Sequence, residues 1–232
     1  MATLVFDIET IPEPWASFDD YTRRQLVKSA GEGGEAAAKA ALGLSPLTGS
    51  IVSLAMYDVE RGQGAVYVVG SSFTETDIEG FVIKERTEKE LLEDFWEGVA
   101  SYDVFVTFNG RAFDIPFLLH RSIVHNVRPS YSFTQSRYLT KQTLPYHVDL
   151  MDELTMYGAM SKRPSLHLLC QAYGIESKKG EVDGSQVAEL FYAKKFRDLA
   201  RHNIEDVLAT TTLYQRWKEN LAPASFLNAI EF

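Results

Sequence analysis

Four acidic residues lie at the ends or edges of apolar segments, where a solvated surface charge is not expected: Asp7, Glu9, Asp114 and Asp206. Residues two apart in a strand point to the same face, so Asp7 and Glu9 should emerge together from the first apolar run. Hard divalent cations take oxygen ligands, and two ions held about 3.5–4 Å apart can activate water and stabilise a leaving oxygen in phosphodiester cleavage. A single Asp at a helix start is more often an N-cap, but the four acids together predict a two-metal site.

The N-terminal half predicts the antiparallel beginning of a mixed sheet. Strands are expected over 3–8, 51–57 and 65–69, the last two joined by the turn ERGQG. Between the first two strands, a segment rich in Ala, Lys and Glu is interrupted by GEGG. This composition predicts a helical insertion in two pieces, over about 19–46.

The C-terminal half predicts alternating helices and short strands. Thr87 and Glu90 form a capping-box pattern at the start of a helix that should end near residue 100. Further strands are expected over 104–108 and 147–150, and further helices over 115–125, 151–157, 165–173, 185–195 and 197–220, with Ser165 and Ser185 near two of the helix starts. His202 and Asp206 lie one turn apart on the last helix and should share a face.

Composition limits the classes of function. The net charge of −9 argues against a protein that coats nucleic acid, but not against an enzyme whose carboxylates carry metal ions. No apolar run approaches the roughly 18 residues of a membrane span, and the chain opens without a basic leader, so a cytoplasmic location without membrane partners is expected. The single Cys170 lies in an apolar run and is expected to be a buried thiol.

Residues 121–147 carry four basic residues and no acid, interleaved with aromatic residues: Arg121, Arg128, Arg137, Lys141, Tyr131, Phe133, Tyr138 and Tyr146. Cations paired with phosphates and rings stacked under bases would suit a single strand of nucleic acid. A solvated loop with some of its rings in the core is an equally good interpretation.

Three motifs in order resemble a known superfamily. FDIET at 6–10 resembles the first exonuclease motif of the DEDD superfamily, NGRAFD at 109–114 the second, and HNIED at 202–206 the third. The wider chain, including SPLTGSIVSLA, HVDLMDEL and DGSQV, resembles stand-alone bacterial proteins akin to the proofreading domain of family B DNA polymerases. The likeness covers nearly all 232 residues.

This resemblance implies an RNase H-like α/β fold, a mixed sheet with helices on both faces, as one exonuclease domain over 1–232. Two divalent cations, Mg²⁺ or Mn²⁺, are expected on Asp7, Glu9, Asp114 and Asp206. The expected reaction is hydrolysis of the terminal phosphodiester at the 3′ end of single-stranded DNA or RNA, with DNA favoured, releasing nucleoside monophosphates. The sequence does not identify a protein partner.

The resemblance also implies roles around the metal site. Thr10 and Asn109 are expected to touch the terminal nucleotide, with Phe113 beside it. For the Phe113 ring, packing in the core is an equally good interpretation. His202 stands at the spacing where the polymerase branch usually has Tyr, and is expected to orient or deprotonate the attacking water. Asp149 is expected to support the site rather than to bind metal.

Two other functions remain open at this point. A catalytically inactive nucleic-acid-binding module could keep the same fold as a docking surface. A hydrolase of nucleotides or small phosphoesters could use the same carboxylates without a path for a polymer strand. Competition by a single-stranded oligonucleotide separates this second alternative from an exonuclease.

Overall fold

The computed structural model describes residues 1–70, 77–134, 136–176 and 186–230. Over these residues a seven-stranded mixed sheet has the order β4-β5-β3-β2-β1-β6-β7. β1 pairs antiparallel with β2 and parallel with β6, so the antiparallel and parallel parts of the sheet meet at β1. The strands are β1 (Thr3–Pro12), β2 (Gly49–Asp58), β3 (Gln63–Val69), β4 (Asp77–Ile78), β5 (Phe81–Arg86), β6 (Val104–Thr107) and β7 (Tyr146–Asp149).

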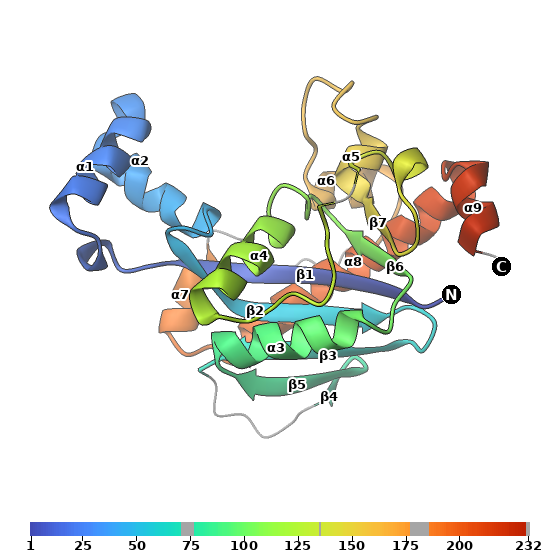
Figure 1. The fold of residues 1–232 in the computed structure, drawn as a ribbon, viewed down its shortest axis with the longest axis horizontal. Helices are drawn as coiled ribbons and strands as arrows, with labels where there is room; N and C mark the ends of the chain where they lie inside the picture. The colour runs from blue at the N-terminus through green and yellow to red at the C-terminus, as the bar shows by residue number, and fades with distance from the viewer. Residues whose placement is uncertain (71–76, 135, 177–185, 231–232) are drawn as a thin grey trace.

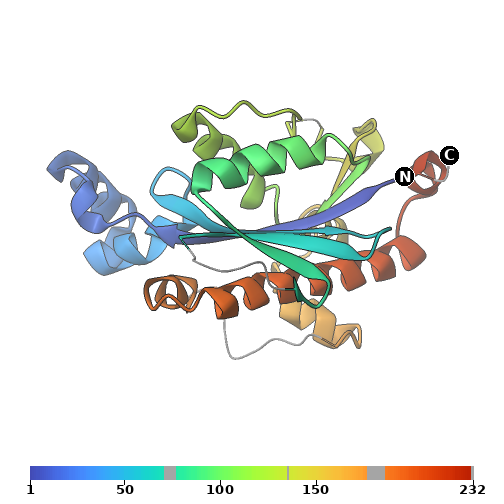
Figure 2. The ribbon, with the colours of Figure 1, turned by 90° about the horizontal axis from the view of Figure 1, so that it is seen from below.

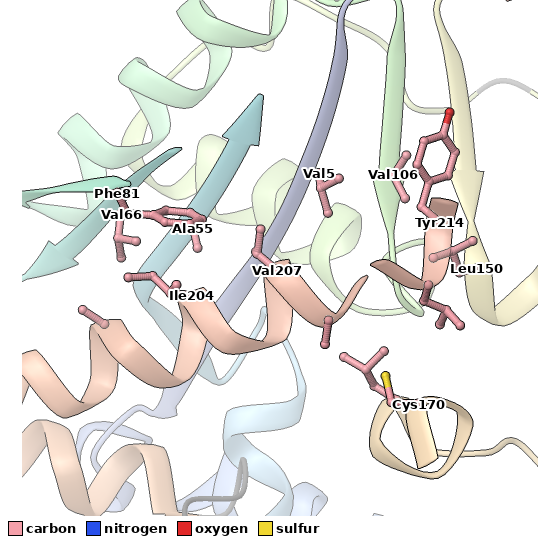
Figure 3. Packing of buried hydrophobic residues seen from close by; sticks show 14 of the residues in the cluster. Val5, Ala55, Val66, Phe81, Val106, Leu150, Cys170, Ile204, Val207 and Tyr214 are labelled. Carbon is pink, nitrogen blue, oxygen red and sulfur yellow. The ribbon is translucent and has the colours of Figure 1, made fainter. Parts of the chain in front are cut away.

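Helices cover both faces of the sheet, as predicted, and each face has its own hydrophobic cluster. Figure 2 shows α3 (Glu88–Val99) and α4 (Asp114–His125) on one face and α8 (Phe196–Asn220) on the other. In Figure 3, Ile204 and Val207 of α8 lie against strand residues such as Val5. The core is therefore divided by the sheet into two layers.

The remaining helices lie at the ends of these layers. Figure 1 shows α1 and α2 projecting from one end of the sheet and α9 at the other. The short 3-10 turn η3 (Leu42–Leu44) joins α2 to β2. The other elements are α1 (Asp20–Ser29), α2 (Gly34–Ala41), α5 (Leu150–Leu154), α6 (Leu166–Ala172), α7 (Val187–Tyr192), α9 (Ala224–Ile230), η1 (Trp15–Ser17), η2 (Gly31–Gly33) and η4 (Leu139–Lys141).

Local sequence patterns predicted most of these elements. β2 and β3 pair antiparallel, and the Thr87 side chain and Glu90 form the expected capping box at the start of α3. The GEGG break falls between α1 and α2. A buried Cys170, 0% exposed, is also confirmed.

Several elements differ from the sequence prediction, including two helix ends and one strand. α5 ends at Leu154 rather than at residue 157, because Met156 and Tyr157 adopt positive φ values of 51° and 54°. α7 ends at Tyr192 rather than at 195, and Lys194 has a φ of 57°. β5, which pairs parallel with β3, was not predicted. Ser185, expected to cap α7, lies outside the described residues.

None of the helices described here is long and apolar enough to cross a membrane. That residues 1–232 form one domain stays a prediction from the sequence.

Candidate active site

Three elements bring the predicted residues together: β1 carries Asp7 and Glu9, α4 begins at Asp114, and α8 carries His202 and Asp206. Along β1, side chains alternate between the two core layers. Leu4, Phe6 and Ile8 belong to the cluster beneath α3 and α4, whereas Val5 and Ile11 belong to the cluster beneath α8. Asp7 and Glu9 are odd-numbered positions of β1, like Val5 and Ile11. Both side chains therefore point to the face covered by α8, and they share a face as the sequence predicted.

Asp7 is held by an amide from α8. Asn203 Nδ2 donates to Asp7 Oδ2 over 2.8 Å and to the Asp7 carbonyl over 3.3 Å. Asn203 Oδ1 in turn accepts from Ser53 Oγ of β2 over 2.8 Å, and both Asn203 and Ser53 are 0% exposed. The chain of bonds from β2 through α8 to β1 fixes the orientation of the Asp7 carboxylate.

Burial raises the pKa of the Asp7 carboxyl well above its usual value, and the charges of Asp114, Glu9 and Asp206 raise it further. The bond from Asn203 acts in the opposite direction. An acid that is destabilised by three neighbouring acids binds a cation more readily, because the cation relieves the repulsion. The charges of the other three acids thus act together on Asp7.

Asp114 is held against β1 rather than used as a helix cap. It is 2% exposed, and its Oδ1 accepts the backbone N–H of Ile8 over 3.1 Å. Burial is the main cause that raises its pKa from 3.8 to about 7, the charge of Asp149 adds to this, and the backbone hydrogen bonds lower it. The N-cap alternative is therefore excluded for this side chain.

His202 lies between two of the acids. Its Nε2 is 3.2 Å from Glu9 Oε1 and 3.8 Å from Asp206 Oδ2, and its side chain is only 4% exposed. One possible ligand atom from each of these three residues lies within 4.8 Å of the others. The helical spacing of four residues thus places His202 and Asp206 on the same face, as predicted, with Glu9 opposite them.

Asp149 supports the loop that precedes Asp114. Its Oδ1 accepts the N–H of Asn109 over 3.0 Å and its Oδ2 accepts the N–H of Arg111 over 2.8 Å. Oδ1 also accepts the N–H of Met151 over 3.0 Å and so caps α5. With these bonds formed by a carboxylate that is 2% exposed, Asp149 has the supporting position that was expected for it.

The three residues expected to touch a nucleotide each have a local contact within the protein. The Thr10 hydroxyl donates to the Gly43 carbonyl over 2.7 Å. Asn109 has a φ of 65°, and its Oδ1 accepts from Arg163 over 3.3 Å. Phe113 is partly buried, and its ring centre lies 4.9 Å from that of Phe117. Contact with a nucleotide stays a prediction for all three.

Part of the basic and aromatic segment 121–147 serves as core and ion-pair structure, whereas Arg128, Tyr138 and Lys141 are exposed. Arg121 is 8% exposed and binds Glu88 with two hydrogen bonds of 2.8 and 2.7 Å. Phe133 packs against Phe105 with ring centres 5.0 Å apart, and Arg137 pairs with Asp152 over 3.1 Å. These contacts favour the second of the two interpretations of this segment.

Asn203 is a site residue that the sequence prediction missed. A signal for it was present, since Asn203 lies three residues after Ala200 and four before Val207, both of which are buried on α8. A polar side chain in the apolar stripe of a helix needs a hydrogen-bond partner, so it could have been assigned to the neighbouring acids.

The donors in this site fit a divalent cation. Carboxylate oxygens suit Mg²⁺ and Mn²⁺, and an imidazole nitrogen is also acceptable to Mn²⁺ and heavier ions. The mutual repulsion around Asp7 would be offset by positive charge at this position.

Comparison with known proteins gives consistent results. The chain is similar to DNA polymerase 1 of Sulfurisphaera ohwakuensis, with 34% identity over 61 residues, which is 26% of this chain and 7% of that polymerase. The family B DNA polymerase of the hyperthermophilic archaeon Pyrobaculum calidifontis has a similar fold, with a TM-score of 0.60 and 20% identity over 94% of this chain and 24% of that one. This chain thus spans a small part of either polymerase. The predicted RNase H-like fold is confirmed.

A family model described as a predicted 3′-5′ exonuclease related to the exonuclease domain of PolB matches residues 61–230. That match covers more than half of the chain and includes Asp114, His202 and Asp206, three of the residues that meet at the site. The chain therefore belongs to the family of predicted 3′-5′ exonucleases related to the exonuclease domain of PolB.

Proposed function

We propose that this protein hydrolyses the terminal phosphodiester at the 3′ end of single-stranded nucleic acid, with DNA favoured over RNA, and releases nucleoside monophosphates. The observation that carries the proposal is the convergence of Glu9, His202 and Asp206 within 4.8 Å beside Asp7, whose pKa is raised by burial and by neighbouring acids. Membership in a family of predicted 3′-5′ exonucleases supports the proposed direction of cleavage.

Asp7, Glu9, Asp114 and Asp206 would hold two divalent cations, Mg²⁺ or Mn²⁺. When bound, such ions activate water and stabilise the negative charge that develops on the leaving 3′ oxygen. The protein contributes fixed geometry: Asn203 orients Asp7, and the Ile8 amide orients Asp114. No covalent intermediate with the protein is required.

His202 would accept the proton of the attacking water or position that water. Glu9 Oε1 at 3.2 Å orients the imidazole, and its burial restricts the ring to few conformations. The variant His202→Ala is expected to lower turnover at least tenfold. His202→Tyr restores the side chain usual at this spacing in the polymerase branch and should recover part of that loss. Turnover near the wild-type value in His202→Ala would reject the role.

The direct test is cleavage of 5′-labelled single-stranded DNA and RNA with Mg²⁺ or Mn²⁺, beside the variants Asp7→Asn and Asp206→Asn. These substitutions keep the shape of the side chains and remove charge, so both should fold. A ladder that shortens from the 3′ end and vanishes in both variants is the expected result. The ratio of the two wild-type rates measures the preference for DNA.

Two results would overturn the proposal. If neither polymer is cleaved with any divalent ion, but an oligonucleotide binds, the protein is a binding module. If a small phosphodiester is hydrolysed and an excess of oligonucleotide does not compete, it is a hydrolase of small substrates.

A further inference from the structure

The helical insertion between β1 and β2 buries very few of its own side chains. α1 has no buried residue, and Ala38 is the single buried residue of α2. Helices of 10 and 8 residues are short enough to be marginal in water without packing. In Figure 1 they project beyond the end of the sheet. The insertion therefore adds little to the core, and its surface is available to a partner.

The insertion is attached beside the candidate active site. The Thr10 hydroxyl, one residue from Glu9, donates to the Gly43 carbonyl in η3. Thr48 Oγ1 donates to the Leu42 carbonyl over 2.8 Å, and η3 packs against β1. Leu44, the next residue, is 69% exposed. The insertion is therefore joined to the sheet next to the part of β1 that carries Glu9.

A groove of about 590 Å³ runs between α1 and α2, with Trp15, Val27, Arg23, Arg24 and Lys28 among its lining residues. The Nζ atom of Lys39 lies 5.4 Å from the centre of the Trp15 ring, and this cation–π contact holds the Trp15 side of the groove in place. α1 is about 15 Å long at roughly 1.5 Å per residue, so its face can meet more than one nucleotide of a strand.

The groove has an excess of positive charge on a protein whose net charge is −9. Its two acids are already paired: Asp20 with Arg23 over 2.5 Å and Glu35 with Lys39 over 2.6 Å. Arg24 and Lys28 are exposed and make no ion pair or side-chain hydrogen bond within the described part of the chain. Four residues apart, they lie on one face of α1.

We infer that Arg24 and Lys28, on the α1 face of the insertion groove, bind the phosphates of the substrate strand on the 5′ side of its terminal nucleotide. This inference rests on the proposed function, because it assigns a path to the strand whose 3′ end the carboxylates receive. The insertion extends the binding surface and takes no part in bond cleavage.

The test compares the wild type with the double variant Arg24→Gln/Lys28→Gln on two substrates. The first is a single-stranded DNA of 20 nucleotides, and the second is a dinucleotide, which offers the carboxylates one phosphodiester and has no further phosphates on its 5′ side. The variant should raise KM for the long strand several-fold at low salt and leave kcat unchanged. Both parameters should be unchanged for the dinucleotide.

Salt dependence gives an independent readout. Each phosphate contact with a single strand contributes about 0.7 to the slope of log affinity against log salt, so two contacts contribute about 1.4. Between 50 and 200 mM salt, the KM of the wild type should therefore rise about sevenfold more than the KM of the variant. A structural defect would not change this slope selectively.

Arg216→Gln/Lys218→Gln is the matched control. Both residues are exposed on the last turns of α8, at the opposite end of the sheet from α1 (Figure 1). It removes the same charge and should behave as the wild type. A second variant, with residues 20–40 replaced by a short Gly-Ser linker, should keep dinucleotide cleavage and lose affinity for the long strand.

The outcomes separate the inference from the proposed function. If the wild type cleaves neither substrate, the proposed function fails. If the wild type cleaves both, and the Arg24→Gln/Lys28→Gln variant has the KM and salt slope of the control variant on the long strand, the inference is wrong and the insertion serves another partner.

Discussion

Replacing Asp114 with Asn is expected to stabilise the protein in the absence of metal, and the gain should grow with pH. The carboxyl is 2% exposed, and burial is the main cause that raises its pKa from 3.8 to about 7. Asn keeps the shape of the side chain, and its Oδ1 can still accept the Ile8 N–H. The substitution therefore removes the buried charge while the hydrogen bond to β1 remains.

The sign and size follow from proton binding. Because the pKa of Asp114 is higher in the folded protein than in the unfolded chain, the folded protein loses stability as the pH rises from about 4 to about 7. At about 1.36 kcal/mol per pH unit, the free energy of unfolding is lowered by about 2 kcal/mol at pH 5 and by at most about 4 kcal/mol at pH 8. Asp114→Asn should recover these amounts.

The assay is urea unfolding of the wild type and Asp114→Asn with a chelator present, at pH 5 and pH 8. Glu97→Gln, an exposed acid on α3, is the control and should change stability little at either pH. Added Mg²⁺ should then stabilise the wild type at pH 8 more than the variant, since the ion neutralises the same charge. A difference between Asp114→Asn and wild type that is equal at both pH values would refute the reasoning.

Three further outcomes are expected. Asn203→Ala removes the hydrogen-bond donor to Asp7 and leaves the Ser53 hydroxyl without its acceptor. It should lower kcat about tenfold and raise the concentration of Mn²⁺ needed for half-maximal rate. An unchanged Mn²⁺ titration would contradict the positioning role of Asn203. The buried His147 has a pKa held well below 6.5, first by burial and then by the charge of Arg111, so it stays neutral when folded, and its own contribution to stability should rise by about 1.4 kcal/mol per pH unit up to about pH 6.5, opposite in sign to that of Asp114. His147→Gln should remove this contribution, so the slope of stability against pH between pH 5 and 6.5, measured by thermal unfolding, should be lower in the variant than in the wild type; an equal slope in the two proteins would count against it. Thr87→Ala removes the N-cap of α3. It should lower the free energy of unfolding by about 1 kcal/mol and Tm by about 2–4 °C, and should leave kcat unchanged. A large loss of activity without loss of stability would show that this reasoning is wrong.

Features that depend on near neighbours in the chain were predictable. The period of two along β1 determines that Asp7 and Glu9 share a face, and the period of 3.6 along α8 does the same for His202 and Asp206. The capping box of Thr87 and Glu90 marks the start of α3 within one residue. These patterns were enough to predict the elements and the shared faces of the acids, whereas the layered fold was predicted from the resemblance to the DEDD exonucleases.

Other features depend on segments distant in sequence. β5 was missed because apolar and polar residues do not alternate regularly along it: Val82, an apolar residue, occupies an outward position and is 39% exposed. Its parallel pairing with β3 also depends on tertiary contacts. The roles of the arginines in segment 121–147 were equally open. Only the position of Glu88 on α3 decides that Arg121 is a buried ion-pair partner rather than a surface cation.

The sequence by itself determined the identity of the carboxylates, the elements that carry them and the faces on which they lie, since strand and helix periods are local properties of the chain. Only the tertiary structure decided that Asn203 orients Asp7, that Glu9 lies 3.2 Å from His202, and that Asp114 binds β1 instead of capping its helix. The physical reason is that each of these contacts joins residues about 100 to 200 positions apart, and packing of α4 and α8 against the sheet fixes their distances.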